Sequence, residues 1–427
     1  MSNTQKKNVP ELRFPGFEGE WEEKKLGEVA EILDGDRGKN YPKSNEFSNK
    51  GHTLFLSASN VTKYGFSNKQ SQFISEEKSN SMRNGKLIQH DIVLTSRGSI
   101  GNVFQYSDWI VDYFPFVRIN SGMLILRTQD ILKSNFIVKY LTSSIGKRRI
   151  KLISFGSAQP QLTKKDMKDF KIKTPLIKEQ QKIGQFFSKL DRQIALEEQK
   201  LELLQQQKKG YMQKIFSQEL RFKDENGNDY PEWERIKFFD VIDKVIDFRG
   251  RTPKKLNMEW SDEGYLALSA VNVKKGYIDF NVEAKYGNLD LYTRWMRGNE
   301  LYKGQVLFTT EAPMGNVAQV PDNKGYILSQ RTIAFNSNEK ITDNFLASLL
   351  SSENVYNDLL KLCSGATAKG VSQKNLNRLY VTIPHSISEQ EEIAEFFKKI
   401  NRLVELQKYK IEHTKSQKQV FLQKMFI

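Results

Sequence analysis

Apolar residues recur alternately three and four positions apart along two long stretches of the chain. The first series runs through positions 183, 187, 190, 194, 197, 201, 204, 208, 211 and 215, and the second through 393, 397, 400, 404, 407, 411, 414, 418, 421 and 425. This spacing is typical of helices that pair in a coiled coil. The fifth and eighth places of both series are polar, and we expect them to control register. We expect the apolar contacts between the helices to come from Ile183, Phe187, Leu190, Ile194, Leu201, Leu204, Ile393, Phe397, Ile400, Val404, Ile411 and Phe421.

The two stretches belong to a longer internal repeat. Residues 178–216 align without gaps to 388–426, and shorter matches with a similar offset pair 56–61 with 268–273. The chain is therefore two copies of one unit, each a globular part followed by a long helix. We expect the helices to pair antiparallel, because the second globular part starts where the first helix ends and must return the chain. The alternative is that each helix packs on its own globular part or on another chain.

The globular parts contain short strand-like runs bounded by Gly, Asn, Ser and Asp, followed by amphipathic helical stretches. No repeated strand-helix-strand pattern with a Gly-rich first turn is present, so we predict an α+β fold. The predicted division is a first globular domain at 1–175, a helix at 176–217, a second globular domain at 218–385 and a helix at 386–427.

Composition and charge narrow the function. The 427 residues carry 66 Lys and Arg against 51 Asp and Glu, a net charge of +15, which predicts an anionic partner. Nucleic acid is the first expectation, a membrane surface the second, and mere solubility the third. No apolar run is long enough to span a bilayer and the N-terminal residues lack a signal peptide, so we expect a cytoplasmic protein without membrane contact. The lone Cys363 and four histidines predict neither a disulfide nor a metal site.

No catalytic constellation is apparent. The sequence lacks a phosphate-binding loop, the signature of an adenine methyltransferase, and a Ser, His or Cys arrangement for nucleophilic catalysis. We therefore predict a non-catalytic protein that binds duplex DNA through two similar domains. Two alternatives stay open: a coiled-coil scaffold whose charge serves solubility, and an enzyme with a concealed nuclease or methyltransferase centre.

Candidate DNA contacts are polar residues on equivalent loops of the two copies. Positions that differ between copies are the better candidates for reading bases, so Arg97 is a candidate for guanine and Glu311 for cytosine, with a surface ion pair as the alternative. Asn102 and Asn316 are alike in both copies and are expected to serve the scaffold or the positioning of the DNA backbone. The full set is Arg37, Lys39, Ser57, Asn60, Lys63, Arg97, Ser99, Gln159, Gln161, Lys164, Arg249, Arg251, Lys254, Asn272, Thr310, Glu311, Lys369 and Lys374. Solvated or structural turns are the alternative for these loops.

The entrance to each helix carries a recurring motif, Pro175 with Glu179, Gln180 and Ile183, and Pro384 with Glu389, Gln390 and Ile393. With the alternating globular and helical layout, this motif resembles the specificity subunits of type I restriction-modification systems. The resemblance covers nearly the whole chain.

The resemblance implies the parts and partners of the complex. Each globular part is then a target-recognition domain that reads one half of a bipartite, asymmetric DNA site. The helices dock methyltransferase subunits, two per chain by the repeat, and a restriction and translocase subunit joins them. Methylation and cleavage, with S-adenosylmethionine, ATP and Mg²⁺, then belong to the partners, and this chain needs no cofactor.

Overall fold

The computed structural model describes residues 8–63, 65–154, 160–282, 284–363 and 370–427. The chain divides into two compact units, the first formed by residues 1–198 and 410–427 and the second by residues 199–409. Each unit contains a globular domain and halves of both long helices. The four-part division expected from the sequence instead separates helices from domains, and it stays a prediction.

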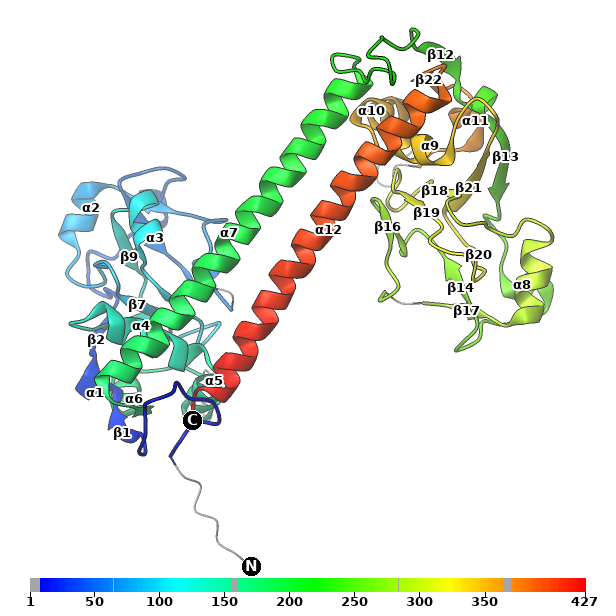
Figure 1. Cartoon of the computed structure of the whole chain (residues 1–427). Coiled ribbons are helices and arrows are strands. Elements are labelled where there is room, and N and C mark those ends of the chain that lie inside the picture. The colour runs from blue at the N-terminus through cyan, green and yellow to red at the C-terminus, as the bar shows by residue number, and fades with distance from the viewer. Residues whose placement is uncertain (1–7, 64, 155–159, 283, 364–369) are drawn as a thin grey trace, which may run out of the picture. The chain divides into compact units, whose positions relative to one another are not determined.

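The first domain is built on two larger sheets, with two-stranded sheets and short helices around them (Figure 1). One sheet has the strand order β2-β10-β7-β8 and the other has the order β6-β3-β9. Its strands are β1 Glu22–Lys25, β2 Glu31–Asp34, β3 Thr53–Leu56, β4 Val61–Thr62, β5 Gly65–Phe66, β6 Phe73–Ile74, β7 Ile92–Thr95, β8 Val103–Gln105, β9 Val117–Ile119, β10 Met123–Arg127 and β11 Lys171–Thr174. Its α-helices are α1 Leu26–Val29, α2 Glu76–Ser81, α3 Asp108–Tyr113, α4 Ile131–Thr142, α5 Ser144–Ile153 and α6 Lys164–Asp169.

The second domain repeats this arrangement. Its larger sheets have the orders β13-β21-β18-β19 and β17-β14-β20, and two-stranded sheets pair β12 with β22 and β15 with β16. Its strands are β12 Glu234–Lys237, β13 Ile242–Asp247, β14 Tyr265–Leu268, β15 Val273–Lys274, β16 Tyr277–Ile278, β17 Tyr286–Gly287, β18 Val306–Thr309, β19 Val317–Gln319, β20 Ile327–Leu328, β21 Thr332–Ser337 and β22 Tyr380–Ile383. Its α-helices are α8 Leu289–Met296, α9 Asp343–Leu350, α10 Glu353–Leu362 and α11 Gln373–Leu376. The predicted α+β fold and internal repeat are confirmed.

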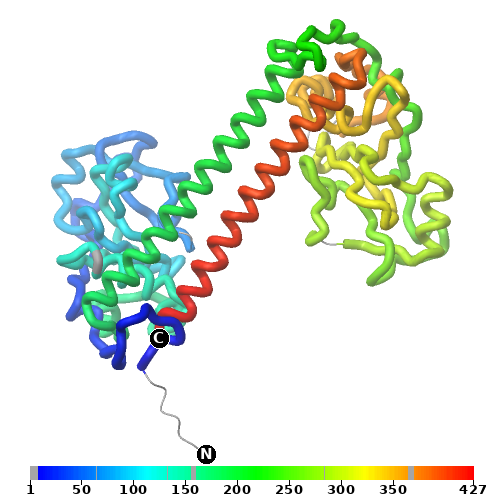
Figure 2. The backbone as a smooth tube through the Cα atoms, viewed as in Figure 1, coloured from blue at the N-terminus to red at the C-terminus, as the bar shows by residue number. Residues whose placement is uncertain are grey.

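The long helices are α7, Ile177–Phe216, and α12, Ile387–Lys424. In the first unit the beginning of α7 lies beside the end of α12 (Figure 2), and the rings of Phe186 and Phe421 meet edge to face 5.1 Å apart. In the second unit the end of α7 meets the beginning of α12, where Phe216 stacks on Phe397 with ring centroids 6.1 Å apart. The helices therefore run antiparallel in each unit, as predicted.

Many side chains of the two heptad series are buried. Ile183, Phe187, Ile393 and Phe397 are buried to 2% exposure or less, whereas Leu203 outside the series is 58% exposed. The ends of the two helices depart from the series in the same way. Near the end of α7, Met212 is buried and Tyr211 is half exposed against Phe396. Near the end of α12, Leu422 is buried and Phe421 is only partly buried. The other buried heptad side chains are Ile194, Ile215, Val404, Gln407, Ile411, Thr414 and Met425.

Side chains from both long helices complete the core of each domain. In the first unit Trp21, Phe136 and Tyr140 of the domain pack with Phe187 of α7 and with Phe426, just beyond the end of α12. The second core contains Trp233 and Phe345 of the domain with Ile215 and Phe216 of α7 and Ile393, Ala394 and Phe397 of α12. Since buried aromatic side chains contribute much of a core's stability, the helices are part of the fold of each domain.

A charged cluster ties the first domain to both helices. Lys139 of α4 and Lys418 of α12 both donate to the carboxylate of Asp191 on α7, and Lys418 Nζ lies 2.5 Å from Asp191 Oδ1. Burial lowers the pKa of Lys139. Burial alone would raise the pKa of Asp191, but the two lysines outweigh it and lower the pKa below its usual value. Asp191 therefore stays ionised and forms ion pairs with both lysines.

We expect Asp191→Asn to destabilise the first unit by about 2 kcal/mol. This is below the roughly 3–5 kcal/mol typical of a fully buried pair, because the Asp191 side chain is 36% exposed. Thermal unfolding measures the effect. At the aligned positions the second copy has Asn401 and Ser348, so adding Lys139→Ser should recover part of the loss. An Asp191→Asn variant as stable as the native chain would contradict this role.

Candidate nucleic-acid interface

Several strands of the first domain reach one edge of its sheets, and the loops there carry most of its candidate residues. Strands β2, β3, β7 and β9 end there at Asp34, Leu56, Thr95 and Ile119, and β10 begins there at Met123. Parallel pairing of β3 with β9, and antiparallel pairing of β10 with β2 and β7, bring these ends together. We call the loops at this edge the recognition edge. They comprise residues 35–39, 57–60, 96–99, 120–122 and 160–162.

Hydrogen bonds group three candidate residues at this edge. Arg37 donates to the carbonyl of Ser121 at 3.2 Å, and the backbone N–H of Arg97 donates to the carbonyl of Gly122 at 3.2 Å. The Arg97 side chain donates from Nε to Gln161 Oε1 at 3.1 Å. Arg37, Arg97 and Gln161 are exposed, so two guanidinium groups and an amide face solvent together.

The second domain has the same recognition edge, at residues 248–255, 269–272, 310–313, 329–331 and 370–374. Strands β13, β14, β18 and β20 end there, and β21 begins there. Glu311 forms an ion pair with Arg331, whose Nε lies 3.2 Å from Glu311 Oε1. Glu311 therefore forms the surface ion pair that was the alternative to a base contact.

Asn60, Asn272 and Thr310 have structural roles, which corrects their place among the candidate contacts. All three are 1% exposed. Asn60 Oδ1 accepts the N–H of Ser57 at 2.9 Å, and Asn272 Oδ1 accepts the equivalent N–H of Ser269 at 3.2 Å. Thr310 Oγ1 donates to a backbone carbonyl of the same edge at 3.3 Å. A side chain buried in this way holds its turn and has little surface to offer DNA.

The expected scaffold role of Asn102 and Asn316 is confirmed. Their side-chain amides donate to the carbonyls of Val61 and Val273, each at 2.9 Å. The same bond at the same place in both domains connects adjacent loops of each edge.

The arginines of residues 248–255 are held by intramolecular contacts. Arg249 forms an ion pair with Asp247, and its Nη2 lies 2.5 Å from Asp247 Oδ2. Burial would raise the pKa of Asp247, but the hydrogen bonds from Arg249 lower it. Arg251 packs its guanidinium 4.2 Å from the ring centroid of Phe248 and donates to the carbonyl of Trp295. Arg249 remains exposed, whereas Arg251 contributes to the local packing.

The other candidates fall into three groups. Lys39, Lys63, Ser99, Lys254 and Lys374 are exposed and Ser57 is partly buried, so all remain predictions. Gln159 and Lys369 lie outside the described residues. Lys164, at the start of α6, lines a separate groove.

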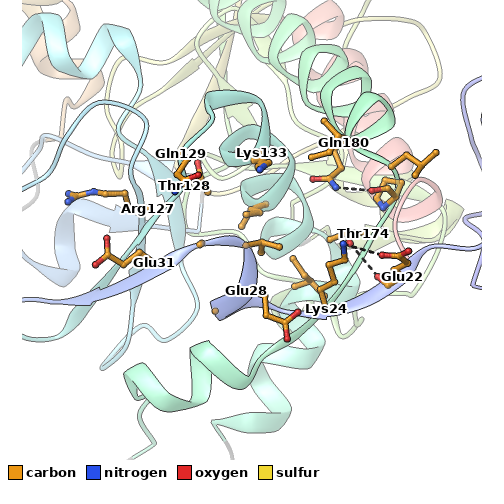
Figure 3. A pocket seen from close by; sticks show the side chains of 18 of the residues that line it. Glu22, Lys24, Glu28, Glu31, Arg127, Thr128, Gln129, Lys133, Thr174 and Gln180 are labelled. Atoms are coloured by element: carbon orange, nitrogen blue, oxygen red, sulfur yellow. Dashed lines mark hydrogen bonds and ion pairs between the residues drawn. The ribbon is translucent and has the colours of Figure 1, made fainter.

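This groove, of about 1080 Å³, lies at the other end of the strands of the first domain. Glu31, where β2 begins, and Arg127, where β10 ends, both line it (Figure 3). Figure 3 also shows Glu22, Lys24 and Lys133 around it, so its wall carries both signs of charge. A mixed wall does not favour a polyanion, and we do not include Lys164 in the recognition edge.

Sequence reasoning missed two residues of the second edge. Arg331 occupies the turn between β20 and β21, and its partner Glu311 lies twenty residues earlier. Gln373 donates from Nε2 to Asp247 Oδ2 at 2.7 Å and so connects α11 to β13. Arg331 could have been noticed as a basic residue in a turn between two buried strands. Comparison of the two copies does not identify it, because the first copy has no arginine at the matching position.

Among the described residues, no helix is long and apolar enough to cross a membrane. Within the same residues, no three His, Cys, Asp or Glu side chains are grouped as metal ligands.

The family model for the type I restriction modification DNA specificity domain matches the chain twice, at residues 18–206 and 230–414. Two curated relatives come from Methanocaldococcus jannaschii. The type I restriction enzyme MjaVIII specificity subunit is 26% identical over 70% of this chain and 74% of its own length. The putative type I restriction enzyme MjaX specificity subunit is 25% identical over 93% of this chain and 91% of its own.

Two solved structures share the fold. The S subunit of a type I restriction-modification system from M. genitalium matches with a TM-score of 0.60 and 14% identity, over 98% of this chain and 99% of its own. A chain from a study of complex assembly and conformational transition of the type I system matches with a TM-score of 0.52 and 14% identity, over 96% and 98%. Both cover both domains and both helices.

Proposed function

The chain belongs to the type I restriction modification DNA specificity family, and we propose that its two domains each read one half of a bipartite, asymmetric duplex site. As a specificity subunit it binds DNA and works with the other subunits of a type I restriction-modification system. The finer proposal is that it directs methyltransferase and restriction subunits to that site. No observation favours the alternative of a scaffold without DNA specificity.

One observation carries the proposal: the same recognition edge occurs twice with different side chains. Arg97 of the first edge aligns with Glu311 of the second, while the scaffold amides of Asn102 and Asn316 are alike. Shared scaffolding with different exposed groups suits two domains that bind the same kind of ligand but read different bases.

We propose further that this chain is non-catalytic and holds no cofactor of its own. Methylation with S-adenosylmethionine, and cleavage driven by ATP with Mg²⁺, then take place on the partner subunits. The twofold repeat supports two methyltransferase subunits per chain. We also propose that the complex is cytoplasmic, because its expected substrate is DNA.

The test uses the full chain with its methyltransferase partner. Methylated bases are mapped across a genome that carries both, and the resulting site is used in binding measurements at several salt concentrations. We expect two separate half-sites and an affinity that falls steeply with salt, because Lys and Arg displace counterions from phosphate. Binding without any sequence preference would favour the scaffold alternative.

A further inference from the structure

Arg97 and Arg331 are held in the same way on their two recognition edges. Arg97 donates from Nε to Gln161 Oε1 at 3.1 Å, and Arg331 Nε lies 3.2 Å from Glu311 Oε1. Within the described residues, no hydrogen bond involves the terminal amino groups of either arginine. Each side chain is thus anchored at Nε, with its two terminal amino groups available to a ligand.

The two arginines occupy different positions of the repeat. The backbone N–H of Ser96 donates to the carbonyl of Gly122 at 2.8 Å, and the N–H of Thr310 donates to that of Arg331 at 2.9 Å. Arg331 therefore corresponds to Gly122, just as Glu311 corresponds to Arg97. The first edge supplies its guanidinium from the loop after β7, and the second supplies it from the turn before β21.

Arg331 is also held in an uncommon backbone conformation. Its φ is 63°, in the left-handed region that glycine and asparagine adopt most easily. Glycine or asparagine could occupy this exposed turn without strain, yet the residue there is an arginine. Strained residues with exposed side chains concentrate at functional sites, which points to a requirement for this side chain.

We propose that Arg331 reads a guanine in the half-site of the second domain and that Glu311 positions it. The inference rests on the proposed function and deepens it. Guanine presents O6 and N7 side by side in the major groove, and the paired amino groups of an arginine match them. Glu311 then acts through Arg331 and does not itself read cytosine.

Charge distinguishes base reading from phosphate binding at this place. Glu311 and Arg331 are both about half exposed, at 46% and 53%, and together they carry no net charge. A neutral pair gives little attraction to phosphate, because phosphate contacts depend on uncompensated positive charge. The pair is therefore suited to fixing the direction of a guanidinium.

The test compares variants in the complex with the methyltransferase partner. Arg331→Gly removes the side chain and suits the positive φ, so the fold should be retained; Arg331→Asn is the second variant, because asparagine also tolerates this conformation. Each is measured on the native site and on duplexes with single base-pair changes. Arg294→Ala is the matched control, since Arg294 bonds Asp290 from Nε at 2.8 Å on α8, with both side chains more than half exposed.

We expect Arg331→Gly and Arg331→Asn to reduce discrimination about 10- to 100-fold at one G·C pair of the second half-site. The first half-site and the salt dependence should stay unchanged, and the control should change nothing. Glu311→Gln should lose part of the same discrimination at the same base pair. Arg97→Ala should instead relax a single position of the first half-site.

Two outcomes would overturn the inference. One is that both Arg331 variants keep native discrimination at every position. The other is equal weakening on all sequences with a shallower salt dependence, which would make Arg331 a phosphate contact. A native chain without any bipartite preference would instead overturn the proposed function, and this inference with it.

Discussion

Replacing Glu389 with alanine is expected to destabilise the second unit by about 3–5 kcal/mol, the largest loss of stability that we anticipate from a single substitution. The Glu389 side chain is fully buried at the start of α12. It accepts hydrogen bonds from Arg221 at 3.0–3.2 Å and from the indole N–H of Trp233 at 3.0 Å. Alanine would leave a largely buried guanidinium without its counter-charge and a buried indole N–H without a partner. Calorimetric unfolding should show the transition of this unit roughly 10 °C lower.

Two further variants test the explanation. Glu395→Ala, two turns along α12, removes an exposed carboxylate paired with Lys398 and should cost under about 0.5 kcal/mol. Glu179→Ala removes the counterpart of Glu389 in the first unit, where it bonds Arg13 at 2.7 and 2.8 Å. The indole nitrogen of Trp21 has no hydrogen-bond partner in the described part of the chain, so this loss should be smaller. Equal effects of Glu389→Ala and Glu395→Ala would refute the buried-pair argument.

Inserting one heptad into both α7 and α12 is expected to lengthen the spacer between the half-sites without changing the half-sites. We propose that the helix pair sets this spacing, because side chains of both helices are part of the core of each domain. Seven residues lengthen a helix by about 10 Å, comparable to roughly three base pairs of duplex. A whole heptad keeps the same side chains facing the partner helix. Sites with the native spacing should then bind about tenfold more weakly.

Insertions that break the pairing provide the controls. A heptad in α7 alone shifts its heptad series against that of α12, and a three-residue insertion in both changes the faces that meet. Both should destabilise the chain without producing a new spacer preference. Mapping methylated bases with each variant measures the result. Retention of the native spacing by the double heptad variant would reject the helix pair as the spacer element.

The long helices were predictable because a heptad series is a local property of the sequence. Ile183 and Phe187 identify their buried face without knowledge of any distant residue. The recognition edge was partly predictable, since Arg97 and Glu311 lie on loops that the internal repeat aligns. The strand runs ending at Thr95 and Thr309 locate these loops.

Contacts between distant residues could not be predicted in this way. Nothing local to Arg13 indicates a bond to Glu179, which lies 166 positions away. The importance of Arg331 depends on a left-handed turn and on an ion pair, and neither leaves a pattern in composition or periodicity. The burial of Asn60 could not be predicted either, because a polar residue in a turn is usually exposed. It depends on the hydrogen bonds of the Asn60 side chain with Ser57 and Ser67.

The two cores are completed by matching helix residues, which has an evolutionary consequence. Phe187 and Phe426 fill the first core and Phe397 and Phe216 the second, and each pair occupies the same two places of the repeat. A domain that packs on the helices at one of these two sites therefore meets phenylalanine side chains in the same places at the other site. Recombination that exchanges a whole domain between related genes, or between the two halves of one gene, leaves the helix residues that complete the core of the new domain unchanged. A cell that carries the recombined gene thus acquires a new DNA specificity in a single genetic event.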